Sequence, residues 1–260
     1  MSRRDEMLRE MELTPVWRLR DRAGRDEAPA EPDATSAASP VAPANPAVVA
    51  EADQQAPGAT GDRRAAIMRM DWPALKERVS GCVDCRLHQQ RNRTVFGVGD
   101  EKAEWLFVGE GPGADEDRQG EPFVGQAGKL LDNMLAAIRL KRGENVYIAN
   151  VVKCRPPGNR NPAPDEASQC EPYLKRQIEL IRPRLIVALG KIAAVNLLGR
   201  DASIASLRGK IHDYMAIPLI VTYHPAYLLR TLPDKAKAWT DLCFAVDTMR
   251  GLQTQDRTPT

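Results

Sequence analysis

The stretch from Glu104 to Gly125 constrains the fold more than any other part of the chain. It begins with the apolar run Trp105–Val108, which has the length and composition of a buried strand. The chain then breaks at Gly109, Gly111 and Gly113, and glycines at this spacing let a backbone turn tightly and approach a ligand closely. A buried strand that ends in a glycine turn is where an open α/β sheet places its ligand. The stretch therefore predicts a ligand site, with a simple strand-to-loop turn carrying a solvated acidic face as the alternative.

Four carboxylates accompany this turn, and they argue against a phosphate ligand. Glu110, Asp115, Glu116 and Asp117 would repel a phosphate group. The Gly-x-x-x-x-Gly-Lys-Ser/Thr spacing of a phosphate-binding loop is also absent.

The composition is that of a globular protein without a membrane segment. Apolar residues make up 43% of the 260 residues, but no apolar run approaches the roughly 18 residues that a membrane span needs. The charged N-terminus lacks the apolar segment of a signal peptide, so we expect a cytoplasmic protein with no membrane partner. The formal net charge of +2 does not by itself indicate nucleic-acid binding.

Changes in composition divide the chain into four parts. Residues 1–22 hold an apolar and basic segment, which is typical either of a short docking helix or peptide for a protein partner or of an unused tail. Residues 23–69 are rich in alanine, proline and acids without periodicity, and they predict a disordered linker. We expect a globular domain over residues 70–250, a flexible tail over residues 251–260, and a monomeric protein.

Strands alternate with helices along the expected domain. Apolar runs predict strands over Trp105–Val108, Val146–Asn150, Leu185–Leu189 and Ile217–Thr222. Helical patterns are found over Asp71–Val79, Gly125–Lys141, from Asp165 through Cys170, and over Pro172–Ile181, Lys191–Leu198 and Pro233–Met249. Pro172 suits the first turn of a new helix, so two helices are expected there. The alternation predicts a parallel sheet covered on both faces.

Four of the five cysteines have the pattern of metal ligands. Cys82 and Cys85 form a C-x2-C pair, and Cys154 and Cys170 must be brought to it by the fold. Four thiolates suit tetrahedral zinc or an iron–sulfur cluster. Zinc ribbons usually carry the C-x2-C pair twice and this chain carries it once, which favours a cluster. Cys243 lies among apolar residues and is interpreted as a small core residue.

A second motif, HPAYLLR, follows the last expected strand. His224 stands at the carboxyl end of that strand, where a parallel sheet builds its site, although a lone histidine is more often structural. Leu228 and Leu229 would be exposed on a projecting loop, beside Arg230, and could then wedge into a duplex. The alternative is packing of both leucines against the final helix.

The motifs GEGPGADED, EPFVG, NVVKCRPPGNR and HPAYLLR, in this order and with the four cysteines, resemble the iron–sulfur-containing family 4 uracil-DNA glycosylases. The resemblance runs from about Asp71 to Arg250 and does not cover residues 1–65. It implies a three-layer α/β/α fold with a central parallel four-stranded sheet. It also implies a [4Fe–4S] cluster on Cys82, Cys85, Cys154 and Cys170, and excision of uracil from double- or single-stranded DNA without a metal in the chemistry.

This resemblance and the chemistry of uracil suggest how the base is bound. Uracil in a duplex must be flipped out before it can be excised. Leu228, Leu229 and Arg230 are expected to fill the gap and grip the backbone, and Phe123 to stack on the flipped base. The amide of Asn150 matches the N3–H donor and O4 acceptor of uracil, whereas cytosine presents the opposite pattern.

Bond cleavage develops negative charge on uracil and positive charge on the sugar. We expect His224 near O2 and the backbone N–H groups of Gly109 and Gly111 to stabilise the anion. The best-known branch of the superfamily has an aspartate in place of Gly111, so the residue that handles the attacking water is left open. The candidates for that water or for the cationic sugar are Glu110, Glu116 and Asn159.

Two hypotheses without catalysis compete with uracil excision. The chain could be an iron–sulfur protein that binds damaged DNA without cutting it, or a zinc-stabilised nucleotide-binding module. A covalent uracil-trapping relative is less well supported, because no histidine-bearing insertion follows Lys153. Release of free uracil from DNA separates an enzyme from both binding modules.

Overall fold

The computed structural model describes residues 57–255. Four parallel strands form the centre of a six-stranded sheet with the order β1-β3-β2-β4-β6-β5. The central strands are β2 (Trp105–Gly109), β3 (Val146–Asn150), β4 (Leu185–Leu189) and β6 (Ile217–Thr222). The predicted parallel four-stranded centre is therefore confirmed. The antiparallel edge strands β1 (Val98–Gly99) and β5 (His212–Tyr214) were not expected from the sequence.

The central strands are buried on both faces, as their unbroken apolar runs require. Successive side chains point to opposite faces of a sheet. Leu106 and Val108 accordingly belong to one core cluster, and Trp105 and Phe107 to another. The sheet thus separates two hydrophobic cores, each covered by helices.

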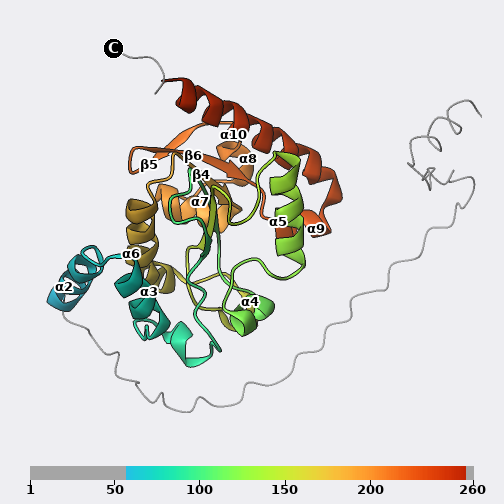
Figure 1. Cartoon of the computed structure of the whole chain (residues 1–260). Helices are drawn as coiled ribbons and strands as arrows, with labels where there is room; N and C mark the ends of the chain where they lie inside the picture. The colour runs from blue at the N-terminus through green and yellow to red at the C-terminus, as the bar shows by residue number, and fades with distance from the viewer. Residues whose placement is uncertain (1–56, 256–260) are drawn as a thin grey trace, which may run out of the picture. The chain divides into compact units, whose positions relative to one another are not determined.

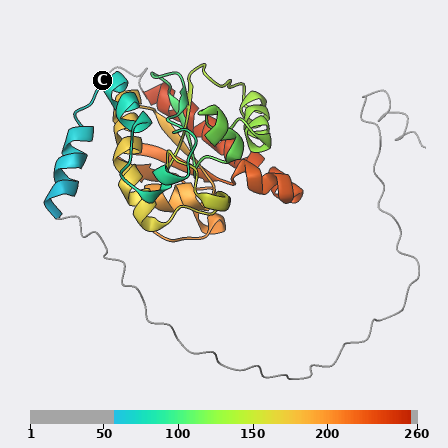
Figure 2. The same cartoon turned by 90° about the horizontal axis from the view of Figure 1, so that it is seen from below.

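Helices cover both faces, which gives the expected three layers (Figures 1 and 2). The first core receives residues from α2 (Pro57–Ile67), α3 (Trp72–Ser80), α6 (Pro164–Ile181), α7 (Lys191–Leu198) and α8 (Ile204–Leu207). The second core receives residues from α5 (Gln126–Ala137) and α10 (Lys235–Gln255). The remaining short elements are α4 (Ala114–Gln119), α9 (Pro225–Arg230), η1 (Arg86–Gln89), η2 (Pro157–Asn159) and η3 (Leu232–Asp234).

The prediction of two helices around Pro172 is wrong, because α6 runs through this proline without a break. A proline inside a helix removes one hydrogen bond and costs about 3 kcal/mol. Here Tyr173, Leu174 and Ile178 are buried in the core on the same helix. Their burial offsets that cost, since each large apolar side chain contributes about 1.5–3 kcal/mol.

The structure also differs from the expected domain boundaries. Helix α2 lies inside the segment 23–69 that was expected to be a linker, and its Ile67 is buried in the first core. The helix has one large apolar residue, so the sequence carries no periodic signal for it. At the other end α10 continues to Gln255, beyond the expected limit at 250. The expected docking segment 1–22 and residues 23–56 and 256–260 lie outside the described residues.

Within residues 57–255, we find no helix that is both long enough and apolar enough to cross a membrane.

Candidate functional site

A cavity of about 630 Å³ lies at the carboxyl ends of the central strands. We call it the strand-end pocket. Its walls include Glu110 after β2, Asn150 at the end of β3, Gly190 after β4 and His224 after β6. Parallel strands end at the same edge of a sheet, so residues far apart in sequence meet there. The structure thus brings residues from the predicted motifs to one pocket.

Asn150 places a buried amide at the floor of this pocket. Its register partner across the sheet is Gly109. A Cβ atom on Gly109 would lie 2.5 Å from Asn150 Oδ1 and 2.5 Å from the ring of Phe123, so only glycine fits. Asn150 is 2% exposed, and its Oδ1 has no hydrogen-bond partner in the structure. Buried acceptors are almost always satisfied, so this oxygen is available to accept a hydrogen bond from a group that enters the pocket.

Phe123 is held above this amide by a constrained loop. Its φ of 55° is in the left-handed region, which is costly for a bulky residue. The Glu116 carboxylate accepts from the backbone N–H groups of Val124 at 2.9 Å, Gly125 at 3.0 Å and Gly113 at 3.1 Å. Arg142 also donates to the Phe123 carbonyl at 2.8 Å. The loop is thus fixed from several sides, and Glu116 is primarily a positioning residue.

His224 lies beside Phe123, with 5.5 Å between the ring centroids. It is the N-cap of α9, and its Nδ1 accepts from the Ala226 N–H at 3.1 Å. Burial, reinforced by the positive charge of Arg230, lowers the pKa of His224 to about 4, although Glu116 opposes this shift. The imidazole is therefore neutral near pH 7. Because Nδ1 accepts a hydrogen bond, the proton is assigned to Nε2, which can donate to a ligand.

The other predicted polar residues also line the strand-end pocket. Burial raises the pKa of Glu110 to about 6, so this carboxyl group titrates close to neutral pH. Asn159 has a φ of 55°, and its Oδ1 accepts from Arg155 Nε at 2.7 Å. Gly111 and the exposed Arg230 complete the predicted lining, and Gly109 lies against the side chains of Asn150 and Phe123.

The predicted exposure of Leu228 is wrong. This side chain is 1% exposed and packs in a third core cluster with Met134, Ala238 and Leu242. The motif forms helix α9 instead of an open loop, and consecutive residues on a helix point in different directions. Leu229 keeps 42% exposure and remains accessible.

Several residues of the pocket were missed in the sequence. Lys191 and Ile192 directly follow β4, so the rule that selected Asn150 and His224 would have found them. Lys191 pairs with Asp201 at 2.8 Å. Gly190, directly after β4, was missed in the same way. Six further lining residues lie inside the quoted motifs but were given no role at the site by themselves: Pro112, Gly113, Pro156, Arg160, Ala226 and Tyr227. Ala127 and Asn161 carry no signal in the sequence.

The four predicted cysteine ligands line a second, small cavity, which we call the cysteine cavity. Cys82 and Cys85 follow α3, Cys154 follows β3, and Cys170 lies on α6. Three sulfurs receive hydrogen bonds. Arg91 Nη1 donates to Cys154 at 3.1 Å, the Lys153 N–H to Cys170 at 3.3 Å, and the Tyr173 hydroxyl to Cys82 at 3.4 Å. Cys243 lies apart on α10, beside Trp239 and Val246.

Burial keeps the thiols of Cys154 and Cys170 protonated near neutral pH. Burial raises the pKa of Cys154 to about 11, although Arg91 lowers it in part, and raises the pKa of Cys170 to about 12. A metal that binds these sulfurs must therefore displace their protons. Over residues 57–255, no three His, Cys, Asp or Glu side chains lie close enough to hold a single metal ion.

One loop connects the two cavities. Cys154 lines the cysteine cavity, and Pro156, Asn159 and Arg160 line the strand-end pocket a few residues later. Any group that fixes the cysteines therefore also fixes one wall of the pocket.

Comparison with known proteins agrees with this geometry. The model of the uracil DNA glycosylase superfamily matches residues 96–243. A type-4 uracil-DNA glycosylase of Archaeoglobus fulgidus is 50% identical over 159 residues, which are 58% of this chain and 79% of the relative. The type-4 enzyme of Thermotoga maritima is 47% identical, over 63% of this chain and 85% of the relative. The type-4 enzyme of Pyrobaculum aerophilum is 44% identical, over 67% of this chain and 93% of the relative. The chain therefore belongs to the uracil-DNA glycosylase superfamily and, within it, to the type-4 uracil-DNA glycosylases.

Proposed function

We propose that the protein removes uracil from DNA by hydrolysing its N-glycosidic bond, which leaves an abasic site and begins base excision repair. The observation that carries this proposal is the buried amide of Asn150, which lines the pocket and whose Oδ1 has no hydrogen-bond partner among residues 57–255. The names of the type-4 relatives support the same activity.

Hydrogen bonding to Asn150 explains the choice of base. Uracil donates from N3–H to the amide oxygen and accepts at O4 from the amide NH2. Cytosine has an acceptor at N3 and a donor at N4, so both pairs would be mismatched in a buried site. The Phe123 ring supplies a stacking face, and its fixed loop means that little ordering is required when the base enters.

His224 stabilises the leaving base. As the bond breaks, negative charge accumulates on uracil, and the neutral imidazole donates to it from Nε2. A donor that is already oriented by its bond to Ala226 needs no reorganisation during the reaction. The backbone N–H groups of Gly109 and Gly111 are proposed to assist.

Positive charge develops on the sugar, and Glu110 is the better placed of the two acids to act on it or on the attacking water. Glu116 already accepts three backbone hydrogen bonds, whereas no hydrogen bond to the Glu110 carboxylate occurs among residues 57–255. Asn159 stays a candidate for a contact with the sugar or water.

The pH dependence of excision tests the role of Glu110. A carboxyl group with a raised pKa is neutral below that value and ionised above it, so the single-turnover rate should rise as pH increases through about 6. Glu110→Gln should lower the highest single-turnover rate about tenfold, which corresponds to about 1.4 kcal/mol of activation free energy. It should also remove the increase of the rate with pH. Glu116→Gln serves as the control, because it should weaken the loop without removing the rise. A wild-type rate that is flat from pH 5 to 8 would contradict this role.

Exposed basic side chains around the pocket are proposed to bind the DNA backbone. Arg160, Lys191 and Arg230 line its rim, and Leu229 is the accessible apolar residue beside Arg230. Phosphate contacts of this kind supply affinity without sequence preference. We therefore propose that Leu229 inserts into the duplex and that Leu228, which is buried, does not. A monomeric state, a cytoplasmic location and a protein partner for residues 1–22 stay predictions.

We propose that the four cysteines hold a [4Fe–4S] cluster. The donor set suits it, since four thiols share one cavity and three of the sulfurs receive hydrogen bonds. The cluster would tie the loop of residues 154–161 to α3 and α6. We expect it to order this wall of the pocket, with no electron transfer in the reaction.

Metal content distinguishes the cluster from zinc. Protein purified without air should absorb broadly near ~400 nm and contain about four irons per chain. Cys154→Ala should lose the iron and much of the soluble yield, whereas Cys243→Ala should keep both, because Cys243 lies outside the cysteine cavity. A colourless protein with stoichiometric zinc would rule out the cluster.

The activity itself is tested by incubating the iron-loaded protein with oligonucleotides that contain one uracil. Free uracil and an alkali-labile abasic site are the expected products. Tight binding to the same DNA without any release of base would instead favour the non-catalytic damage-binding module.

A further inference from the structure

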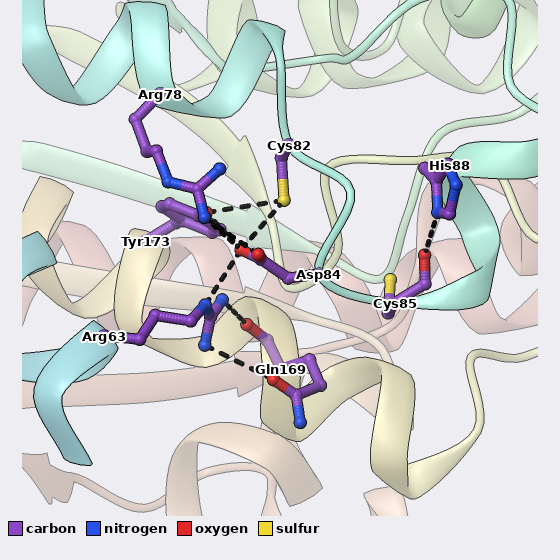
Figure 3. A network of polar contacts seen from close by, with 8 residues as sticks. All are labelled: Arg63, Arg78, Cys82, Asp84, Cys85, His88, Gln169 and Tyr173. Carbon is purple, nitrogen blue, oxygen red and sulfur yellow. Dashed lines mark hydrogen bonds and ion pairs between the residues drawn. The ribbon is translucent and has the colours of Figure 1, made fainter. Parts of the chain in front are cut away.

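Helix α2 is attached to the segment between the first two cysteines, which we call the cysteine loop (Cys82–Cys85). The attachment is made by Arg63, whose Nε donates to Asp84 Oδ2 at 2.8 Å (Figure 3). The same guanidinium donates to the Gln169 carbonyl at 2.5 Å and lies 5.4 Å from the centroid of the Tyr173 ring. One side chain thus joins α2, the cysteine loop and α6.

Asp84 is the centre of this network. Its carboxylate also accepts from Arg78 Nη2 at 2.8 Å and from the Tyr173 hydroxyl at 2.6 Å, as the dashed lines in Figure 3 show. Cys82 Sγ lies 3.2 Å from Asp84 Oδ2. The Asp84 and Arg63 side chains keep only 13% and 18% exposure, so solvent screens them weakly.

This arrangement has a consequence once Cys82 binds metal as a thiolate. A carboxylate within hydrogen-bond distance of a thiolate repels it, and at low exposure the repulsion is costly. Arg63 and Arg78 both donate to the Asp84 carboxylate and supply two positive charges beside it. These cations therefore offset the charge of Asp84 beside a ligand sulfur.

We propose that α2 stabilises the metal-bound cysteine loop, with Arg63 as the positioning residue that offsets the charge of Asp84 beside Cys82. This inference rests on the proposed cluster. It assigns a role to a helix that lies outside the matched residues 96–243 and inside the segment that the sequence suggested was a linker. The functional unit accordingly includes residues from 57 onward.

The test compares variants of the full chain, purified without air, by the rate at which the ~400 nm absorption disappears in excess EDTA. Arg63→Ala should lose its cluster about tenfold faster than the wild-type protein. The expected change is smaller than for a fully buried ion pair, because the Arg63–Asp84 pair keeps some exposure to solvent. Arg63→Lys should be intermediate, since it keeps the charge but not the fork that reaches both Asp84 and Gln169.

Arg64→Ala is the matched control. Arg64 lies on the same helix and pairs with Glu171 on α6 at 2.7 Å, but it does not contact the cysteine loop. The rate at which Arg64→Ala loses its cluster should stay within about twofold of the wild-type rate, because an exposed ion pair contributes little stability. Equal rates for Arg63→Ala and Arg64→Ala would overturn the proposal.

A double-mutant cycle with Asp84→Asn isolates the charge effect. If Arg63 acts by offsetting the Asp84 charge, Arg63→Ala should accelerate cluster loss much less in the Asp84→Asn background. Fully additive effects would overturn the charge argument.

Hydrogen exchange in the purified full chain gives a second readout that does not depend on the absorption of the cluster. Backbone amides of residues 82–89 should exchange faster in Arg63→Ala than in Arg64→Ala, and unchanged exchange counts against the proposal. This arm also applies if a variant fails to load iron. Wild-type protein that contains no iron would refute the cluster, whereas iron-loaded variants with unchanged release and exchange would refute only the role of α2.

Discussion

Replacing His224 by alanine is expected to slow excision of uracil by at least about 100-fold, the usual effect of removing an anion-stabilising donor. The pKa of His224 is lowered to about 4, so the wild-type group acts as a neutral donor and its contribution should persist down to mildly acidic pH. The measurement is the single-turnover rate on an oligonucleotide with one uracil. Affinity for uracil-free DNA should change little, because His224 faces the pocket and not its exposed rim.

His224 also caps α9, and this second role needs its own control. Losing an N-cap costs about 0.5–2 kcal/mol of stability and could displace the helix. His224→Asn keeps a capping side chain but lacks the Nε2 donor, so it should be nearly as slow as His224→Ala. If His224→Asn restores the wild-type rate, the histidine is a structural cap and not a catalytic residue. His212→Ala, which alters a histidine on β5, should leave the rate unchanged.

Asn150→Asp is expected to remove most activity on uracil and to create weak release of cytosine. The substitution is nearly isosteric, which matters because Gly109 and Phe123 leave no spare room around this side chain. A carboxylate lacks the donor for uracil O4 but accepts from cytosine N4, and in its protonated form it donates to cytosine N3. Each unsatisfied buried group should cost about 1–3 kcal/mol, or roughly 5- to 150-fold in rate.

The measurement is single-turnover excision from matched oligonucleotides with uracil or cytosine in an unpaired position. Asn196→Asp is the control, because it makes the same chemical change at an exposed position of α7. There the side-chain amide donates to the Ile192 carbonyl. An iron-loaded Asn150→Asp protein that keeps the wild-type uracil rate would remove Asn150 from base recognition.

The central part of the fold could be predicted because its strands are long and wholly apolar. All four central strands were found within a residue or two of their limits, and with them the parallel sheet. The edge strands β1 and β5 were missed because they are two and three residues long and are partly exposed. Helix α2 was missed for a different reason, since Arg63 and Ile67 attach it through tertiary contacts that no local pattern reveals.

The candidate site was predictable where residues follow parallel strands. Asn150 and His224 were selected by that rule, and the structure brings both to one pocket. The burial of Leu228 was not predictable, because the motif does not show whether the segment is a helix or an open loop. A helix buries one of two neighbouring leucines, whereas a projecting loop exposes both. The sequence does not distinguish Glu110 from Glu116 as candidates for the water or the sugar. The structure does, because the Glu116 carboxylate accepts hydrogen bonds from the backbone N–H groups of Val124 and Gly125.

The order of the site residues along the chain has a consequence for how the protein is made. All four thiols of the cysteine cavity precede β4, whereas Gly190 and His224 follow β4 and β6. Chains are synthesised from the N-terminus at about 5–20 residues each second, so Cys170 emerges several seconds before His224. A nascent chain thus presents every proposed iron ligand before it contains the histidine proposed to stabilise the leaving base. The order of the sequence therefore makes the proposed metal ligands available first and the proposed catalytic group several seconds later.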